Sequence, residues 1–139
     1  MGERKKRWFK LDNAAKLYPA IARSKWSSIF RLSFLLEDAV NAQTLQTALN
    51  QTLPRFPALK VHIKRGFFWY YFEENDAPLI IMPDIGHPCM PFHFKGNNGY
   101  LLRVLYGEKR VSAEFFHALT DGTAGMVFLK TLLCQYLSL

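Results

Sequence analysis

Apolar positions along the chain recur with two different periods, which predicts strands in some segments and helices in others. The segment 58–64 alternates Leu59, Val61 and Ile63, as a half-buried strand does, and Gly66 turns it into an aromatic partner strand of a hairpin. Further runs of apolar and aromatic residues without helix breakers predict more strands. The full set of predicted strands is 26–36, 58–64, 67–72, 79–82, 100–106 and 110–117.

Two segments carry the three- and four-residue spacing of an amphipathic helix. In the first, Asn41 or Asp38 can cap the start, and Pro54 and Pro57 end the helix. Its repeating positions are Leu45, Ala48, Leu49, Thr52, Leu53 and Phe56. The second begins at about Thr123, and its buried side holds Met126, Leu129, Leu132, Leu133, Tyr136 and Leu137.

This order of elements predicts an α/β fold: a two-layer sandwich of a mixed, mostly antiparallel sheet with helices on one face. A first ordered piece is expected over 8–22, and 83–99 is expected to be a loop because it combines three prolines with the run Gly96-Asn97-Asn98-Gly99. The 139 residues suit a single domain spanning 1–139.

Composition narrows the class of protein. Half of the residues are hydrophobic and only 21% are charged, which excludes an intrinsically disordered chain. No apolar run approaches the roughly 20 residues of a membrane-spanning helix, and no apolar run follows the charged N-terminus as it would in a signal peptide. Two cysteines make no disulfide framework, so we expect a cytoplasmic protein.

The formal net charge of +7 is concentrated at one end of the chain. Residues 1–10 form a basic arm with a single acidic residue, Glu3, and contribute more than half of the excess charge. The basic residues of this arm are Arg4, Lys5, Lys6, Arg7 and Lys10. A charged arm is more often a solvated tail than a phosphate-binding surface, so nucleic-acid binding is not the expected function.

The candidate chemistry lies between the last strand and the last helix, in the pattern HxxxDG formed by His117, Asp121 and Gly122. The parity of the strand places the imidazole of His117 with apolar neighbours in a protected space, where it could act as a general base. Asp121 could cap the helix or pair with an arginine, and Gly122 allows backbone angles that other residues resist. Gly125 lets the helix pack closely. The alternative is that His117 is a packed core residue with no catalytic role.

The stretch FFHALTDGTAGMVFLKTLL resembles the HxxxDG segment of the coenzyme A-dependent acyltransferase superfamily. This superfamily includes chloramphenicol acetyltransferase, alcohol acetyltransferases, wax ester synthases and the condensation domains of peptide synthetases. The helix ending LPRFPALKV, the aromatic hairpin and the two strands before the motif are similar in order to the N-terminal half of these enzymes, and most of all to alcohol acetyltransferases. The resemblance implies half of a chloramphenicol acetyltransferase-like fold.

The resemblance also implies a mechanism and site residues. His117 would be the general base that takes a proton from an alcohol or amine as it attacks an acyl thioester, with acyl-CoA or acyl-pantetheine as co-substrate and no bound cofactor. Asp121 would be structural, pairing with an arginine, and Gly122 would keep the turn tight beside the substrate channel. The candidates for that arginine are Arg23, Arg31, Arg55 and Arg103.

Two departures from the family pattern affect these expectations. Many relatives have a second histidine where this chain has Phe116, which bears on the subfamily more than on the chemistry. The family's enzymes also have two similar halves, and the second half, with its share of the site, has no counterpart here. We therefore expect an N-terminal lobe that is inactive alone and that requires a C-terminal lobe, a partner chain or self-association. The alternative function is a non-catalytic interaction or assembly module that retains the half-fold.

Other candidate sites are weaker. His87, Cys89 and His93 offer zinc-type ligands, but their spacing matches no standard site and no metal is expected. The aromatic run FFWYYF beside Lys64 and Arg65 could stack nucleic-acid bases, although such a run is more often core and partner surface.

Overall fold

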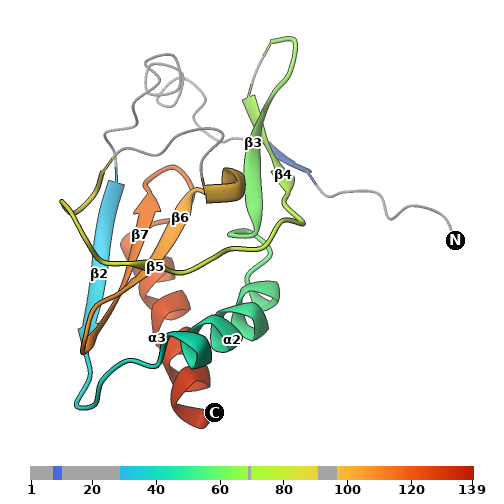
Figure 1. Ribbon diagram of the computed structural model, residues 1–139. Coiled ribbons are helices and arrows are strands. Elements are labelled where there is room, and N and C mark those ends of the chain that lie inside the picture. The colour runs from blue at the N-terminus through green and yellow to red at the C-terminus, as the bar shows by residue number, and fades with distance from the viewer. Residues whose placement is uncertain (1–7, 11–28, 69, 91–96) are drawn as a thin grey trace, which may run out of the picture.

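The computed structural model describes residues 8–10, 29–68, 70–90 and 97–139, and Figure 1 shows how their elements are arranged. The strands are β1 (Trp8–Lys10), β2 (Ile29–Leu35), β3 (Val61–Arg65), β4 (Tyr70–Glu74), β5 (Met82–Pro83), β6 (Leu102–Tyr106) and β7 (Arg110–Phe116). The helices are α2 (Ala42–Thr52) and α3 (Gly122–Ser138), with short 3-10 turns η1 (Leu53–Arg55) and η2 (Asn97–Gly99).

Within the described residues the strands form two sheets where the sequence predicted one. A four-stranded sheet has the order β2-β7-β6-β5, antiparallel except for the parallel pair β5–β6, and a three-stranded antiparallel sheet has the order β1-β4-β3. The larger sheet and the two helices form the mixed, mostly antiparallel α/β sandwich expected from the sequence, with both helices on one face (Figure 1).

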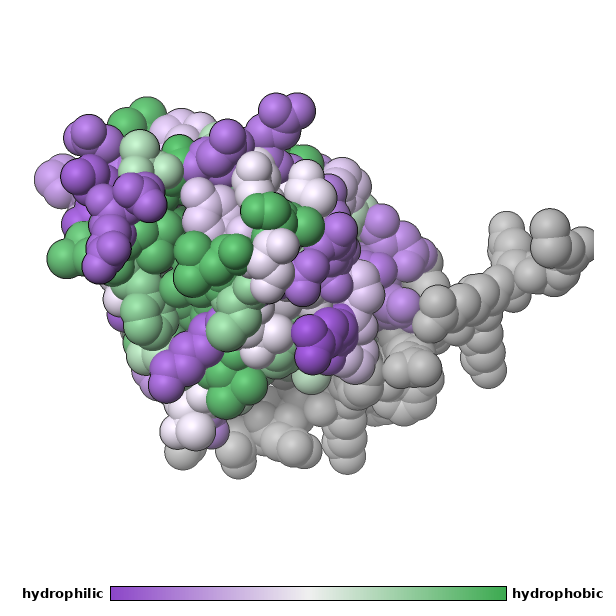
Figure 2. Space-filling model, turned by 90° about the horizontal axis from the view of Figure 1, so that it is seen from below, coloured by the Kyte–Doolittle hydropathy of each residue, from purple (hydrophilic) through white to green (hydrophobic). Residues whose placement is uncertain are grey.

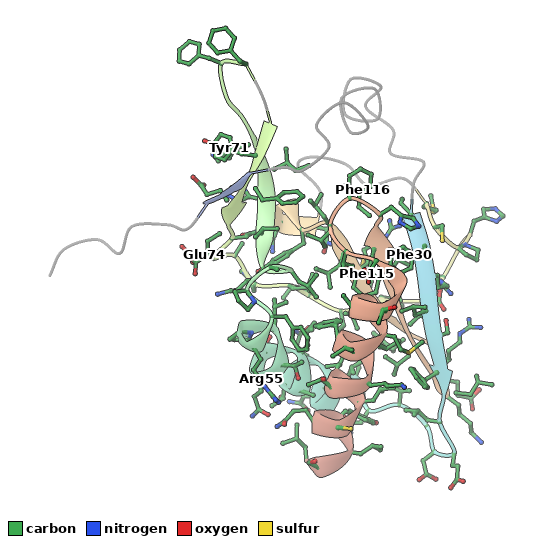
Figure 3. The ribbon with its side chains drawn as sticks, turned by 180° about the vertical axis from the view of Figure 1, so that it is seen from behind. Phe30, Arg55, Tyr71, Glu74, Phe115 and Phe116 are labelled. Carbon is green, nitrogen blue, oxygen red and sulfur yellow. The ribbon has the colours of Figure 1, made fainter. Side chains whose placement is uncertain are left out.

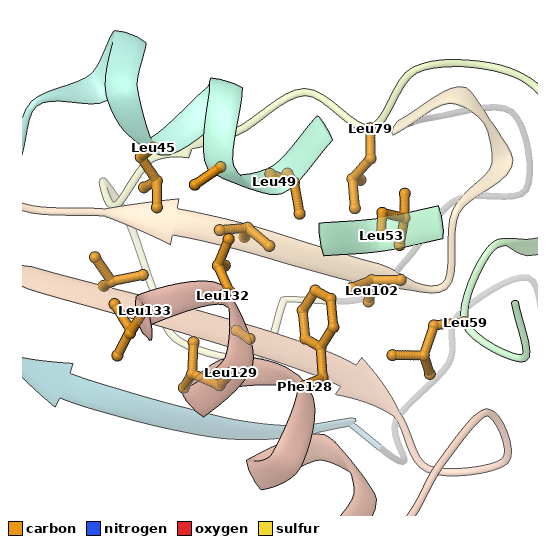
Figure 4. Close-up of a cluster of buried hydrophobic side chains, with 14 of the residues drawn as sticks. Leu45, Leu49, Leu53, Leu59, Leu79, Leu102, Phe128, Leu129, Leu132 and Leu133 are labelled. Carbon is orange, nitrogen blue, oxygen red and sulfur yellow. The ribbon is translucent and has the colours of Figure 1, made fainter. Parts of the chain in front are cut away.

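The main core lies between that sheet face and the helices (Figure 4). Alternate residues of β7 point into it, because successive side chains of a strand point to opposite faces. Val111, Ala113 and Phe115 are fully buried there against α3. The helices contribute the leucine positions that the spacing predicted, together with Phe128: Leu45, Leu49, Leu129, Leu132 and Leu133. The predicted buried face is correct for α2, whereas on α3 the predicted Leu137 is 70% exposed and the fully buried Phe128 was missed.

A second, smaller cluster joins the two sheets. Val61 of β3 and Phe72 of β4 pack with Leu101 and Phe116 next to the larger sheet. Of the alternating residues predicted for 58–64, Val61 and Ile63 serve this inter-sheet contact, whereas Leu59 packs in the main core.

Two boundaries differ from the prediction for identifiable reasons. The first helix ends at Thr52, and Leu53–Arg55 continue as a 3-10 turn because Pro54 has no backbone N–H to donate. Of the strand predicted at 79–82 only Met82 lies in a strand, β5, which includes Pro83 from the predicted loop. The side chain of Gln46 on α2 donates to the carbonyl oxygen of Leu79 at 2.9 Å and accepts from the N–H of Ile81 at 2.9 Å, so a helix side chain satisfies this backbone instead of a neighbouring strand. The ordered piece predicted at 8–22 falls mostly outside the described residues, apart from β1.

Candidate functional site

His117 lies directly after β7, in the turn that leads to α3. The turn is closed by the N–H of Leu119, which donates to the carbonyl oxygen of Phe116 at 2.9 Å. The phenyl ring of Phe30 on β2 stacks on that of Phe115, with centroids 5.3 Å apart, and lies against the imidazole of His117 at 4.7 Å. Figure 3 shows Phe30 and Phe115 side by side on neighbouring strands. The imidazole thus extends a row of aromatic rings at the end of the sheet.

The expectation that His117 lies in a protected space is wrong for this chain, since its side chain is exposed. β7 ends at Phe116, so His117 lies one residue beyond the strand and two residues beyond Phe115, the last β7 residue that packs in the main core against α3. The imidazole contacts the ring of Phe30, and the residue as a whole is exposed. A reactant can therefore approach the ring, which would not be possible at a filled core position.

Asp121 is the N-cap of α3. Its side chain accepts a hydrogen bond from the N–H of Ala124 at 2.8 Å, which satisfies one of the free donors of the first helical turn. The capping role proposed from the sequence is therefore confirmed. Of the four candidate arginines, Arg31 and Arg103 bind other carboxylates, and Arg23 lies outside the described residues. The pairing of Asp121 with an arginine remains a prediction.

The two glycines of the motif segment differ in their surroundings. A Cβ at Gly122 would meet nothing within 4 Å, and Gly122 is not among the residues with positive φ, so the special backbone freedom expected of it is not used. A Cβ at Gly125 would lie 3.1 Å from the ring of Phe115 and 3.4 Å from Leu32. Gly125 is therefore the glycine that lets α3 approach the sheet closely, as the sequence suggested.

The sheet face opposite the helices carries a network of charged side chains that the sequence analysis missed. Glu114 of β7 is buried, with 2% of its side chain exposed, and lies between Arg31 of β2 at 3.0 Å and Arg103 of β6 at 2.9 Å. Arg31 also binds Asp84 through both terminal nitrogens, at 2.8 and 3.0 Å, and Arg110 binds the same carboxylate at 2.9 Å. The sequence offered one signal for this network, because Glu114 interrupts the apolar run of β7. Charged residues are almost never buried unless they are paired.

The pKa values within this network follow from its contacts. The hydrogen bonds from Arg31 are the largest cause that holds the pKa of the Asp84 carboxyl below its ordinary value of 3.8. The hydrogen bond to Asp84 is likewise the main cause that raises the pKa of Arg31, whereas burial lowers the pKa of Arg103. Burial also raises the pKa of the Cys89 thiol, so this cysteine is not an activated nucleophile.

Two hollows lie away from His117. A groove of about 540 Å³ near the end of α3 is lined by apolar side chains including Leu35 and Leu137 and by Glu37 and Asp38. The view from below shows apolar side chains gathered among polar ones on this side of the molecule (Figure 2). A second pocket of about 370 Å³ lies beside the charged network and is lined by Met82, Pro83, Asp84, Ile85, His87, Met90, Arg103, Leu105 and Glu114.

The remaining candidates can be placed in part. His87 is exposed and Cys89 is half-buried, and His93 falls outside the described residues, among which no cluster of metal ligands occurs. The aromatic hairpin divides as the sequence suggested: Phe72 is core, while Phe67 and Phe68 are exposed. No helix of the described chain is long and apolar enough to cross a membrane.

Comparison with known proteins finds a likeness in fold and none in sequence. No protein-family model matches the sequence, and no curated protein matches it. The starter condensation domain of rhizomide synthetase RzmA has a TM-score of 0.71 at 13% identity, over 94% of this chain and 37% of that one. The tallysomycin biosynthesis protein TlmII gives 0.70 at 13% identity, with the same coverage. Polyketide synthase associated protein 5 from Mycobacterium tuberculosis gives 0.62 at 18% identity, over 91% of this chain and 32% of that one.

The fold is therefore that of one part of a condensation domain. The expected half of a chloramphenicol acetyltransferase-like fold is confirmed at this level, and the chain spans about a third of the length of the structures it matches. A variant of the RzmA starter condensation domain has been solved in complex with C8-CoA.

Proposed function

We propose that this chain is the N-terminal lobe of an acyltransferase that moves an acyl group from a coenzyme A or carrier-bound thioester to an alcohol or amine. The observation that carries the proposal is the position of His117: an accessible imidazole at the end of β7, on a fold shared with condensation domains. The C8-CoA complex of an RzmA variant supports a thioester of coenzyme A as co-substrate.

In the proposed reaction, the imidazole of His117 takes the proton of the acceptor O–H or N–H as the acceptor attacks the carbonyl carbon of the thioester. The tetrahedral oxyanion then collapses, the C–S bond breaks, and the imidazolium returns the proton to the departing thiolate. The products are the ester or amide and the free thiol. The ring of Phe30 lies against the imidazole, and Asp121 caps the start of α3 four residues away.

The oxyanion requires hydrogen-bond donors that are placed before the reaction. The one contact of the imidazole of His117 that we describe is with the apolar ring of Phe30, which has no hydrogen bond to donate, and the residue is exposed. We infer that a second lobe or partner chain covers the imidazole, supplies donors and forms the thioester channel. The chain alone is then expected to have little or no activity, because positioning and oxyanion stabilisation provide much of the rate enhancement.

The test is thiol release from short acyl-CoA substrates in the presence of alcohols and amines. The protein is produced in its complete natural reading frame, or with the partner that supplies the second lobe. We expect His117→Ala to lower turnover by about 10²- to 10⁴-fold, the contribution of a general base. His87→Ala is the matched control, since His87 is another exposed histidine outside the motif.

Retained turnover in the His117→Ala variant would remove the imidazole from the mechanism. If the two-lobed protein itself releases no thiol with any acceptor, the alternative function as a non-catalytic assembly module is favoured. Unfolding curves of both variants serve as the check that a loss of turnover is not a loss of fold.

A further inference from the structure

A row of aromatic rings leads from the main core to the imidazole of His117. Phe56 meets Phe128 edge-on with ring centroids 5.3 Å apart, and Phe128 meets Phe115 edge-on at 6.0 Å. Phe115 stacks on Phe30 at 5.3 Å, and Phe30 lies against His117 at 4.7 Å. All four distances fall in the range of favourable aromatic pairs. The row therefore connects the packed core with the candidate site.

Phe30 rests on the most tightly packed part of this row. Phe115 and Phe128 are fully buried, and close-packed interiors leave such rings little room to move. The register of β2 and β7 pairs Phe30 with Phe115, and Figure 3 shows the two rings together. His117 follows two residues after Phe115, at the diagonal position that an aromatic side chain on the neighbouring strand can reach. The core therefore supports the ring that lies against the imidazole.

A general base has to direct its nitrogen at the proton that it removes. In many catalytic sites a third group, hydrogen-bonded to the base, sets this orientation. The contact that we describe for the imidazole of His117 is instead with Phe30. The carboxylate of the motif, Asp121, accepts from the N–H of Ala124 at 2.8 Å as the cap of α3. Packing against a ring is thus the means of orientation that these contacts offer.

We propose that Phe30 is a positioning residue for His117. Its ring narrows the range of rotamers that the exposed histidine samples, so that a larger fraction of molecules holds the imidazole in one orientation. This inference rests on the proposed acyl transfer and deepens it, because Phe30 acts on the reaction only through His117. Two tests separate its failure from a failure of the proposed function.

The first test needs no activity. In NMR spectra of the chain above about pH 8, where an ordinary histidine is neutral, the ring current of Phe30 should displace the imidazole C–H signals of His117 from those of the exposed His87. Phe30→Leu should move these signals toward those of His87, and Phe30→Tyr should keep them displaced. Phe34→Leu is the matched control and should leave them in place, because Phe34 also lies on β2 and packs against the main core. Unchanged His117 signals in Phe30→Leu would overturn the proposal.

The second test measures thiol release by the two-lobed protein. Phe30→Leu should lower kcat by about two- to tenfold, the scale of one aromatic pair, with little change in KM. The reason is that the imidazole acts in the proton transfer and not in substrate binding. Phe30→Tyr, which keeps the ring, should restore kcat, and Phe34→Leu should leave it at the wild-type value.

A wild-type kcat in the Phe30→Leu variant would contradict the positioning role. An equal loss in Phe34→Leu would contradict it too, since the effect would then be a general loosening of β2, which unfolding curves of the variants would also reveal. A two-lobed protein that releases no thiol, or that is unaffected by His117→Ala, contradicts the proposed function instead. The NMR comparison then still decides whether Phe30 orients the imidazole.

Discussion

At the scale of single residues, the fit of α3 against the sheet depends on one missing side chain. Gly125 faces the ring of Phe115, and a Cβ there would come within 3.1 Å of it. Phe115 is fully buried and has little room to move, since it stacks on Phe30 and meets Phe128 edge-on with centroids 6.0 Å apart. The same aromatic row supports His117, so the close approach at Gly125 also bears on the candidate site.

We predict that Gly125→Ala destabilises the protein by about 1 kcal/mol. Alanine is the better helix former by about 1 kcal/mol, but overpacking against Phe115 costs about 1–3 kcal/mol. Gly122→Ala is the matched control, because its Cβ would lie in open space and a change below about 0.5 kcal/mol is typical there. Denaturant unfolding of both variants measures the difference. Equal free energies of unfolding for the two variants would show that α3 shifts to accommodate the methyl group added at Gly125.

At the scale of elements, buried ion pairs tie three strands to the segment that follows β5. Glu114 joins β7 to β2 and β6 through Arg31 and Arg103, and Asp84 joins Arg31 to Arg110. The N–H of Cys89 donates to Glu114, and Arg103 donates to the carbonyl oxygen of Met90, so the loop is attached to the sheet by its backbone. These contacts make the polar face of the sheet a structural surface.

The lowered pKa of Asp84 predicts acid sensitivity. A carboxyl whose folded pKa lies below its unfolded value stabilises the protein fully above about pH 4, and this stabilisation is lost as the pH falls through the folded pKa. Asp84→Asn should lower the free energy of unfolding at neutral pH by about 2 kcal/mol, the scale of charged hydrogen bonds, and should weaken the decline below pH 4.

Urea unfolding at several pH values between 3 and 7 or so measures this effect, across the window set by the ordinary carboxyl pKa. The control is Asp38→Asn, which changes an exposed carboxylate in the loop before α2 and should leave both quantities near those of the wild type. An unchanged acid limb in the Asp84→Asn variant would contradict the assignment.

At the scale of the whole molecule, the two sheets are joined by a cluster much smaller than the main core. Val61, Phe72, Leu101 and Phe116 are its buried members. Because Phe116 is the last residue of β7 and His117 follows it, the hairpin sheet and the candidate catalytic turn are attached at the same point.

We predict that Phe72→Ala loosens the hairpin more than the rest of the molecule. Truncation of this buried ring should cost about 3 kcal/mol. Amide hydrogen exchange should rise in β3 and β4 more than in β6 and β7, whose stability comes from the main core. Phe68→Ala, at an 87% exposed ring of the same hairpin, should leave exchange unchanged. A uniform increase throughout the chain would show that the two sheets unfold as one unit.

Sequence periodicity was sufficient for the helices, the main strands and the helix cap, because these depend on neighbours within a few residues. Leucines at helical spacing mark the buried face of α2, and of the two residues predicted as its possible cap Asn41 is the one that accepts from the N–H of Thr44, at 3.0 Å. The HxxxDG spacing placed His117 and Asp121 at the junction of a strand and a helix, where the structure has them.

Contacts between distant segments were decided only by the tertiary structure. The exposure of His117 and its packing on Phe30 depend on where β7 ends relative to β2. The division into two sheets depends on which strands pair. Glu114 of β7 binds Arg31 of β2, which is 83 residues away along the chain. Its second partner, Arg103, lies on a third strand, β6. Local spacing fixes which face of an element is apolar, whereas the pairing of charges across strands follows from the register that the folded sheet adopts.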